Sequence, residues 1–279
     1  RVAAMGGAFT SLGADLSSMT INPAGLGMYR SSVLGLSGAY DNSRSTNGNV
    51  NYGATKGNFA FNQIGSALNL YQSSGTLVSF TLGFAYNKLA DLNYRNSAGW
   101  NDGEVTIGEF FAEQMYGINP NLLTEQGAPF TNSDIYPDEW GGVLAYRTKL
   151  IAPVSDADGQ FSGNYEVLGV PLENRVNSRL AVESMGSGGE YELSMGFNFY
   201  VGTTLSIQSI EQIVYYDYLE EYVGANASGE QTSTSYRPMV ANYGSGLNFK
   251  IGAILRPTTA LRIGVAYHSP TSVSLTKSY

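Results

Sequence analysis

The sequence predicts an all-β protein, a transmembrane antiparallel β-barrel, and three observations lead to this fold class. Charged residues make up only 14% of the chain, whereas soluble globular domains carry about 25%. No stretch approaches the roughly 18–20 consecutive apolar residues that a membrane-spanning helix needs. Several segments instead alternate apolar and polar residues, which is typical of strands with one face towards lipid and the other towards a polar lumen.

Residues 1–31 are expected to form a compact, irregular segment of short helix and turn, packed inside something larger. Residues 5–16 are mostly small or apolar and poor in β-branched side chains. Pro23 biases Asn22 away from helical backbone angles, and the nearby glycines permit tight turns. Residues 32–279 are then expected to supply the strands and loops of the barrel.

Five segments after this point alternate with a period of two, so each is expected to form a strand with two different faces. In residues 76–87 every second residue from Val78 to Tyr86 is large and apolar, and the positions between are small or polar. A tilted strand of about 9–11 residues can cross a membrane, and the segments have about this length. The five segments are residues 32–41, 76–87, 190–199, 246–255 and 261–268.

The connections differ strongly in length. Residues 256–260 form a short turn between two strands, whereas residues 88–178 and 219–236 are long polar excursions. Short turns on one side and long extracellular loops on the other are typical of outer-membrane barrels. A soluble β-sandwich would rarely contain a loop of about 90 residues.

One helix is expected inside the first excursion. Ile107, Phe110, Phe111 and Met115 follow the i, i+3, i+4, i+8 spacing of an amphipathic helix, and Leu122 and Leu123 come after Pro120. This apolar stripe has two interpretations. It could pack against the interior of its own loop, or it could line an apolar groove above the mouth of the barrel.

The composition excludes several kinds of site. A net charge of −8 without any basic run argues against nucleic acid as a partner. The chain has no cysteine and one histidine, His268, so thiolate and multi-histidine metal sites are excluded. His268 is expected on the polar side of its strand, as an ordinary lumen residue. No nucleophile constellation is found, so the sequence predicts no enzyme, no metal and no cofactor.

Three further motifs are interpreted as ordinary structure. Residues 186–189 (Gly-Ser-Gly-Gly) lack the lysine of a phosphate-binding loop and are expected to form a turn between strands. Asp217, Glu220 and Glu221 lie among tyrosines and are expected in a solvated loop near an aromatic girdle. Asp156, Asp158 and Gly159 are expected to form a simple turn, because a calcium loop in this register would require carboxylates where Val154 and Tyr165 stand.

Two parts of the chain resemble the FadL/TodX family of outer-membrane transporters for hydrophobic compounds, and residues 27–32 (GMYRSS), which lead into the first strand, resemble members from Bacteroidetes. The first is the run from Met5-Gly6-Gly7-Ala8 through Asp15 to Asn22-Pro23-Ala24-Gly25-Leu26. The second is Arg256-Pro257 followed by residues 261–270 (LRIGVAYHSP). The resemblance covers residues 1–40 and 245–275 well, and the middle of the chain resembles the family only in its general character.

The resemblance implies a 14-stranded barrel whose lumen is plugged by the N-terminal segment, residues 1–31, as a hatch. Such proteins bind long-chain fatty acids or aromatic hydrocarbons and release them sideways through a gap in the wall. The sequence itself predicts only about eight to ten strands, so we expect it to stop short of the natural C-terminus.

The expected function is passive transport of hydrophobic compounds, such as fatty acids, across the cell outer membrane, with outer-membrane lipid and the hydrophobic compound as partners. Burial of apolar surface would drive binding. The family motif is Asn22, Pro23 and Ala24, expected to fix a turn more than to touch ligand. Candidate ligand-binding residues are, in the hatch, Met5, Phe9, Leu12, Leu16, Met19 and Ile21, and in the outer groove Phe110, Phe111, Met115, Leu122 and Leu123.

The sequence leaves two alternatives to passive transport. A non-transporting accessory barrel could hold other outer-membrane proteins in a secretion or assembly complex, with residues 88–178 as its docking surface, because fold does not fix function. A barrel enzyme would need a catalytic histidine or acidic pair in the right place, and His268 alone makes this the weakest of the three hypotheses.

Overall fold

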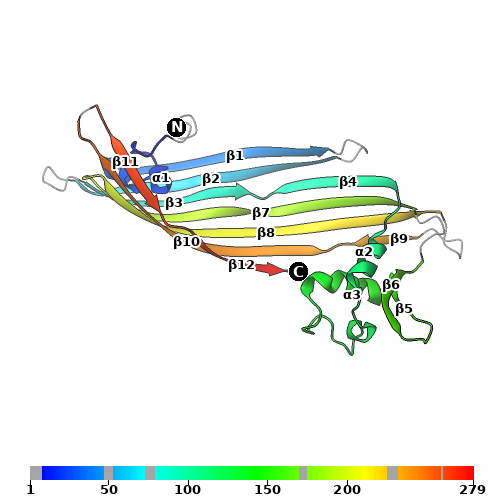
Figure 1. Cartoon of the computed structure of the whole chain (residues 1–279). Helices are drawn as coiled ribbons and strands as arrows, with labels where there is room; N and C mark the ends of the chain where they lie inside the picture. The colour runs from blue at the N-terminus through cyan, green and yellow to red at the C-terminus, as the bar shows by residue number, and fades with distance from the viewer. Residues whose placement is uncertain (1–7, 47–52, 73–78, 170–174, 225–231, 259) are drawn as a thin grey trace.

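The computed structural model describes residues 8–46, 53–72, 79–169, 175–224, 232–258 and 260–279. They form one large, curved antiparallel sheet, with an N-terminal segment against one end and a small lobe at the other (Figure 1). The predicted all-β class is confirmed. Among the described residues, no helix is both long enough and apolar enough to span a bilayer.

The large sheet is a meander in which strands pair with their neighbours in chain order, β1-β2-β3-β7-β8-β10-β11. Three shorter strands continue this path: β4 follows β3 along β7, β9 precedes β10 along β8, and β12 follows β11 along β10. Within the described residues the two edge strands, β1 and β12, do not pair with each other. The strands are β1 (Val33–Thr46), β2 (Gly53–Gln72), β3 (Ser79–Asp91), β4 (Tyr94–Gly103), β7 (Arg175–Phe197), β8 (Val201–Val223), β9 (Ser233–Tyr236), β10 (Met239–Leu255), β11 (Ile263–His268) and β12 (Ser272–Ser278).

The two faces of the sheet differ in polarity: polar side chains are buried on one face, and large apolar side chains are exposed on the other. We call the face that contacts the N-terminal segment the inner face. On β8 the inner residues Thr204 and Ser206 are fully buried, whereas Leu205 and Ile207 on the outer face are 43% and 52% exposed. Polar groups are normally the exposed ones and large apolar groups the buried ones. The period-2 pattern therefore places apolar side chains on the outside of this sheet.

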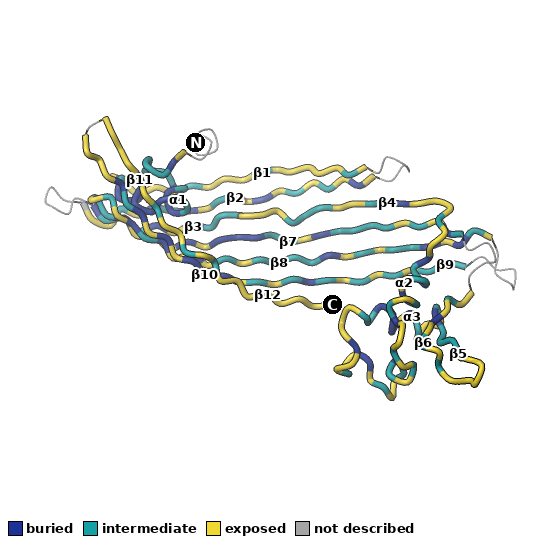
Figure 2. The backbone as a smooth tube through the Cα atoms, in the orientation of Figure 1, coloured by how far each residue is buried: buried dark blue, intermediate teal, exposed yellow. Residues whose placement is uncertain are grey.

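The N-terminal segment contains α1 (Ser18–Ile21) and the 3-10 helix η2 (Pro23–Met28), which agrees with the predicted mixture of short helix and turn. It lies on the inner face and contacts β3, β7, β8 and β10. Figure 2 shows that buried residues concentrate where this segment meets the strands.

The lobe, residues 104–169, is inserted between β4 and β7. It contains α2 (Ile107–Gln114), η3 (Pro120–Leu123), η4 (Pro137–Glu139), α3 (Trp140–Arg147), and the hairpin of β5 (Ile151–Ser155) and β6 (Phe161–Val167). Thr106 caps α2 in a capping box with Glu109. Asp156 accepts hydrogen bonds from the backbone N–H groups of Asp158 and Gln160, which makes the β5–β6 connection an ordinary Asp-Gly turn.

The sheet splits along part of its length. β2 pairs with β3 from Gln63 to Gln72, but residues 53–61 of β2 pair only with β1, and β4 pairs with β7 instead of β2. Side chains cross this split instead of backbone ladders. Lys56 Nζ lies 3.2 Å from Glu183 Oε1, and Asn58 Nδ2 donates to Asp91 Oδ2 at 2.8 Å.

The predicted loop boundaries were wrong at both excursions. Strand β4 and the ends of β3 and β7 lie within residues 88–178, and the end of β8 and all of β9 lie within residues 219–236. These strand parts carry polar residues on both faces, so they lack the alternation that revealed the others. The tyrosine-rich acidic stretch, residues 215–222, is therefore strand and not loop.

The predicted turn at residues 186–189 was also wrong, because these residues lie inside β7. Gly186 stands opposite the break between β3 and β4, where Leu92 N donates to its carbonyl and Asn93 bonds both its N–H and its carbonyl. Its φ of +147° and its closeness to Glu211 O leave no room for a side chain. Gly186 is therefore required by the irregular backbone of β7 opposite the break between β3 and β4.

Candidate functional site

The N-terminal segment touches the sheet backbone to backbone. Gly196, Gly202 and Gly252 stand in one register row on the inner faces of β7, β8 and β10. A Cβ atom on Gly202 would lie 2.2 Å from Pro23 O, and one on Gly252 would lie 1.9 Å from Asn22 Oδ1. The absence of side chains in this row is what lets the segment lie directly on the strands.

The Asn22-Pro23-Ala24 motif sits at this contact and is buried. Asn22 Oδ1 accepts a hydrogen bond from Ala24 N at 3.1 Å and so caps η2. Its Nδ2 donates to Thr10 O at 2.7 Å and lies 3.3 Å from Ala253 O on β10. These contacts bind the segment to itself and to the sheet, which is the structural role favoured for the motif.

The apolar candidates of the segment face the strands. Phe9, Leu16 and Met19 are 3%, 8% and 0% exposed, and Met19 and Leu16 pack with Leu26 and Tyr29 in one cluster. Leu12 and Ile21 are half-buried, and Met5 lies outside the described residues. Burial, with the nearby Asp15 carboxylate, raises the pKa of Tyr29 to about 12.

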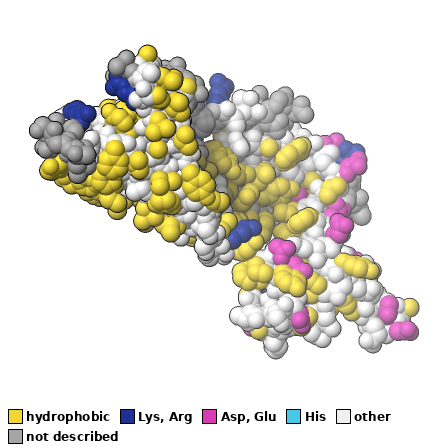
Figure 3. Space-filling view, turned by 60° about the vertical axis from the view of Figure 1, so that its left-hand side comes forward, with side chains coloured by type: hydrophobic (Ala, Val, Ile, Leu, Met, Phe, Trp, Pro, Cys, Tyr) yellow, Lys and Arg dark blue, Asp and Glu magenta, His cyan; other side chains and the backbone are white. Residues whose placement is uncertain are grey.

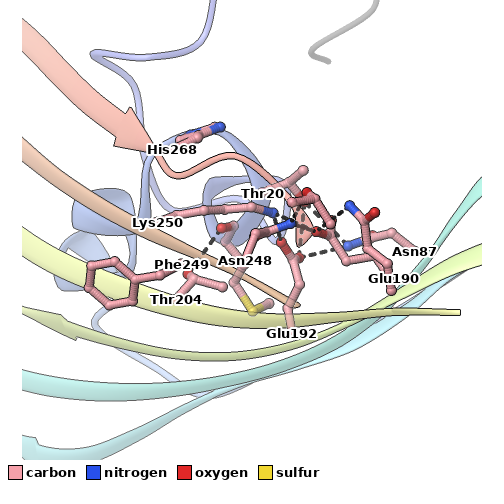
Figure 4. A network of polar contacts seen from close by, with 12 residues as sticks. Thr20, Asn87, Glu190, Glu192, Thr204, Asn248, Phe249, Lys250 and His268 are labelled. Carbon is pink, nitrogen blue, oxygen red and sulfur yellow. Dashed lines mark hydrogen bonds and ion pairs between the residues drawn. The ribbon is translucent and has the colours of Figure 1, made fainter. Parts of the chain in front are cut away.

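A buried ionic network stands beside the segment on the inner face (Figure 4). Lys250 Nζ on β10 lies 3.0 Å from Glu190 Oε1 and 2.7 Å from Glu192 Oε1 on β7. All three residues are less than 5% exposed. Asn248 Nδ2 also donates to Glu190 Oε1, at 3.2 Å. Buried charges of this kind are tolerated because they are paired and hydrogen-bonded.

The same network holds the segment by its polar groups. Thr20 Oγ1 and Asn87 Nδ2 donate to Glu192 Oε2 at 3.0 and 2.7 Å. Thr204 Oγ1 donates to Met19 O at 3.0 Å, and His268 Nε2 lies 3.0 Å from Ile21 O. His268 is thus on the inner face, as its alternation predicts. Three of these contacts, to Thr20 Oγ1, Met19 O and Ile21 O, hold α1 directly on the inner face.

Sequence reasoning missed this network although its signal was present. Glu190, Glu192 and Lys250 occupy the polar positions of two predicted strands. Small residues fill many neighbouring inner positions, so three charges there stand out. Which charges meet depends on strand register, because Glu190 and Lys250 are 60 residues apart.

The lobe has a hydrophobic core of its own, and this core decides between the two interpretations of the apolar stripe on α2. Phe111, Met115 and Leu123 are at most 4% exposed and pack with Ile135, Val143 and Ile151. Leu122 is partly buried against the same core, whereas Phe110 is 57% exposed. Burial also raises the pKa of Tyr165, which donates to Ile118 O from the same core. Most of the stripe therefore packs inside the lobe.

A buried carboxylate attaches the lobe to the sheet. Glu220 on β8 has no exposed surface, and its Oε1 accepts hydrogen bonds from Ile107 N at 2.7 Å and Tyr218 Oη at 2.5 Å. Ile107 is the first residue of α2, where a negative charge is favoured by the helix dipole. The lobe is thus held at the N-terminus of its first helix.

Glu220→Ala is expected to loosen the lobe without unfolding the sheet. Removing the acceptor leaves Ile107 N and Tyr218 Oη without this partner, at a cost of about 1–3 kcal/mol. Hydrogen exchange should speed up at the amides of α2. Glu221→Ala on the exposed side of the same strand is the matched control and should leave this exchange unchanged. Equal protection in both variants would contradict the anchoring role.

A groove of about 860 Å³ lies between the lobe and the β9–β10 end of the sheet. Its apolar lining includes Phe111 and Trp140 from the lobe and Met239 from the sheet, and Leu144 in the lining is 46% exposed. Lys149, Arg237 and Lys277 also line it. Arg237 is paired with Asp217, and Lys277 lies 4.5 Å from the centre of the Tyr279 ring. The groove can hold a compound with an apolar body and an anionic end.

The two predicted sets of ligand-binding residues lie at opposite ends of the sheet (Figure 1). Of the described N-terminal candidates, Leu16 and Met19 pack with Ala67 of β2 and Ala85 of β3. Of the lobe set, only Phe111 lines the groove. The groove residues Trp140 and Leu144 lie one turn apart on α3, but Met239 comes from β10, about 100 residues later, so no periodic signal joined the three.

Neither a protein-family model, nor a curated protein, nor a solved structure matches this chain.

Proposed function

We propose that the chain forms wall and plug of an outer-membrane β-barrel of the FadL/TodX type, which passively transports hydrophobic compounds such as long-chain fatty acids. The observation that carries the proposal is the inverted polarity of the sheet. Its outer face exposes large apolar side chains, and its inner face buries Lys250, Glu190 and Glu192. Apolar side chains exposed to lipid carry no free-energy penalty of hydration. Membrane barrels combine such an apolar exterior with a polar interior.

The N-terminal segment is the plug in this proposal. It covers the inner face at one end of the strands and is held there by close backbone contacts and the ionic network. A solute would have to displace this segment or leave the lumen before reaching it. In the second case the solute would leave through the split between β2 and β4, where side chains and not backbone hydrogen bonds join the two strands.

The groove is the proposed site of first binding. A fatty acid would lay its chain along Trp140, Leu144 and Met239, which buries apolar surface worth about 25 cal/mol per Å². Its carboxylate would lie near Lys149 or Lys277. The segment itself offers the ligand little apolar surface, since Phe9, Leu16 and Met19 are already buried.

Trp140→Ala and Leu144→Glu are expected to weaken binding of a long-chain fatty acid by about tenfold or more, which corresponds to about 1.4 kcal/mol. Equilibrium binding to the purified protein in detergent micelles measures the effect. Tyr116→Ala is the matched control, because Tyr116 is a 69% exposed aromatic of the same lobe that does not line the groove. Unchanged affinity in both groove variants would place the fatty acid elsewhere, and absence of any binding would refute the fatty-acid proposal.

The charge of the lobe favours the accessory-barrel alternative as a second candidate. Residues 104–169 contain ten acidic and two basic residues, a net charge of −8, which equals the net charge of the whole chain. Such a single-sign surface steers a basic partner protein. Stoichiometric co-purification of another protein in mild detergent, lost when the lobe acids are neutralised, would support this function over transport.

A further inference from the structure

Two buried oxygen atoms in the ionic network have no hydrogen-bond partner among the described residues of the protein. They are Ser206 Oγ on β8 and Asn248 Oδ1 on β10. Ser206 is fully buried and Asn248 is 7% exposed. A buried polar group that is left unpaired destabilises a folded protein. Each of these oxygens therefore requires a bound water molecule or ligand.

Strand register brings the two oxygens together. Ser206 is the direct partner of Asn248 on one side and of Glu192 on the other, and all three residues lie on the inner face. The side chains of such paired residues begin about 4.5–5.5 Å apart at their Cβ atoms. One small ion or one water molecule can therefore contact both oxygens. Figure 4 shows the labelled side chains of Asn248 and Glu192 in the same cluster.

The orientation of the Asn248 amide is fixed by its nitrogen. Nδ2 donates to Glu190 Oε1 at 3.2 Å and to Thr271 Oγ1 at 3.1 Å. These two bonds use both N–H groups of the amide. Exchanging the nitrogen and the oxygen would set the amide oxygen against the Glu190 carboxylate. Oδ1 is therefore the end of the amide that still needs a donor or a cation.

The network carries more negative than positive charge. Glu190 and Glu192 contribute two negative charges and Lys250 one positive charge, and within the described part of the chain Lys250 is the only cation paired with either carboxylate. His268 bonds to Ile21 O instead. Figure 3 shows acidic side chains on the surface of the far end of the sheet and of the lobe, where water solvates them. The excess charge of the network is buried, where it is costly.

Three kinds of occupant fit these oxygens, and the charge distinguishes between them. A water molecule would pair both oxygens but leave the excess negative charge. A proton on one carboxylate would remove the charge but leave both oxygens unpaired. A monovalent metal cation does both, and hydroxyl, amide and carboxylate oxygens are the ligands that hard cations prefer. A divalent ion would replace an excess of one negative charge by an excess of one positive charge.

We infer that the inner face binds one monovalent metal cation between Ser206 Oγ and Asn248 Oδ1, beside the carboxylates of Glu190 and Glu192. Such a site needs oxygen ligands only, so a chain without cysteine and with one histidine can form it. By fixing Glu192 the cation also stabilises the contact with the N-terminal segment, since Glu192 Oε2 accepts the hydrogen bond of Thr20 Oγ1. The inference depends neither on the transport function nor on a membrane around the sheet.

Equilibrium unfolding of the full chain in detergent micelles tests the site, with sodium chloride titrated against choline chloride at constant ionic strength. Choline is a monovalent cation that is too large for a buried site. We expect stability to rise with sodium and then to saturate. At about 100 times the dissociation constant, the unfolding equilibrium should be shifted about 100-fold. Broadening of the sodium NMR signal by the protein measures binding directly.

Ser206→Ala separates this cation from a general effect of salt. The variant lacks one oxygen ligand, so its sodium titration should move to about tenfold higher concentration. In choline chloride alone it should be at least as stable as the wild type, because the lost hydroxyl had no partner.

Thr81→Val is the matched control. Thr81 Oγ1 is also a buried hydroxyl oxygen without a partner in the described protein, but Thr81 pairs with Gly196, four residues along β7 from Glu192. This variant should keep the sodium titration of the wild type.

Each other result overturns the inference in its own way. Equal stability of the wild type in sodium and in choline would mean that water, and no cation, fills the site. An unchanged sodium titration in Ser206→Ala would place the sodium elsewhere. An equal shift in Thr81→Val would show that the shift does not report the loss of a ligand. Stabilisation by calcium chloride at concentrations where sodium has no effect would mean that the site takes a divalent ion.

Discussion

Lys250→Ala is expected to destabilise the folded protein by about 3–5 kcal/mol, because it removes the cation from two buried carboxylates. Glu190 and Glu192 are 2% and 3% exposed, and Lys250 Nζ is within 3.0 Å of both. Without the ammonium group, their charges would face each other in a site that excludes water. The urea midpoint in detergent micelles should fall accordingly, and the amides of α1 should exchange faster because Glu192 also holds Thr20.

Two control variants separate this effect from a general loss of charge. Arg147→Ala breaks an exposed pair with Glu125, whose side chain is 80% exposed, and should cost less than about 1 kcal/mol. Combining Lys250→Met with Glu190→Gln and Glu192→Gln removes the whole set of charges and should restore most of the lost stability. A midpoint for Lys250→Ala within the error of the Arg147→Ala value would show that the network does not support the fold.

Gly202→Ala is expected to displace the N-terminal segment from the sheet. The added Cβ would lie 2.2 Å from Pro23 O and 2.3 Å from Pro23 C, and neither backbone atom can move without moving η2. Overpacking at such a contact costs about 1–3 kcal/mol. The expected signs are faster proteolysis within residues 8–31 and, if that segment is the plug, a higher ion conductance in planar bilayers.

Gly188→Ala is the matched control for this experiment. Gly188 also lies on the inner face, and its nearest neighbour to an added Cβ would be the Ala90 methyl group at 3.6 Å, which is ordinary contact. This variant should behave like the wild type. Equal proteolysis and conductance in both glycine variants would mean that the segment does not rest on Gly202 in solution.

The strands found from the sequence are those whose two faces meet different surroundings. The predicted segment 261–268 becomes β11 (Ile263–His268), and 246–255 is the larger part of β10 (Met239–Leu255). Strand β4 (Tyr94–Gly103) was missed because Asn96 and Asp102 interrupt the face that carries Tyr94, Ala98 and Trp100, so YRNSAGWNDG shows no clear alternation. A pattern of alternation reports a difference between two environments, so it cannot reveal a strand that has similar surroundings on both sides.

The site was less accessible to sequence reasoning than the fold. The helical stripe correctly indicated a helix, now α2 (Ile107–Gln114), but spacing cannot say whether its apolar side meets the lobe core or a ligand. Likewise Asn22 could be assigned a turn, yet its bonds to Thr10 and Ala253 depend on how β10 lies beside the segment. Local patterns define elements, whereas these contacts depend on register between distant strands.

The attachment of Asn22 fixes an order of assembly. Its Nδ2 reaches Ala253 O, 231 residues later, and Val265 O, 243 residues later, whereas nearly every strand pair of the meander joins close neighbours in sequence. Contacts across so long a chain form late, because they carry the largest loss of chain entropy. The N-terminal segment, synthesised before the strands that hold it, therefore obtains its complete binding surface last, and the inner face remains open until β10 and β11 have joined the sheet.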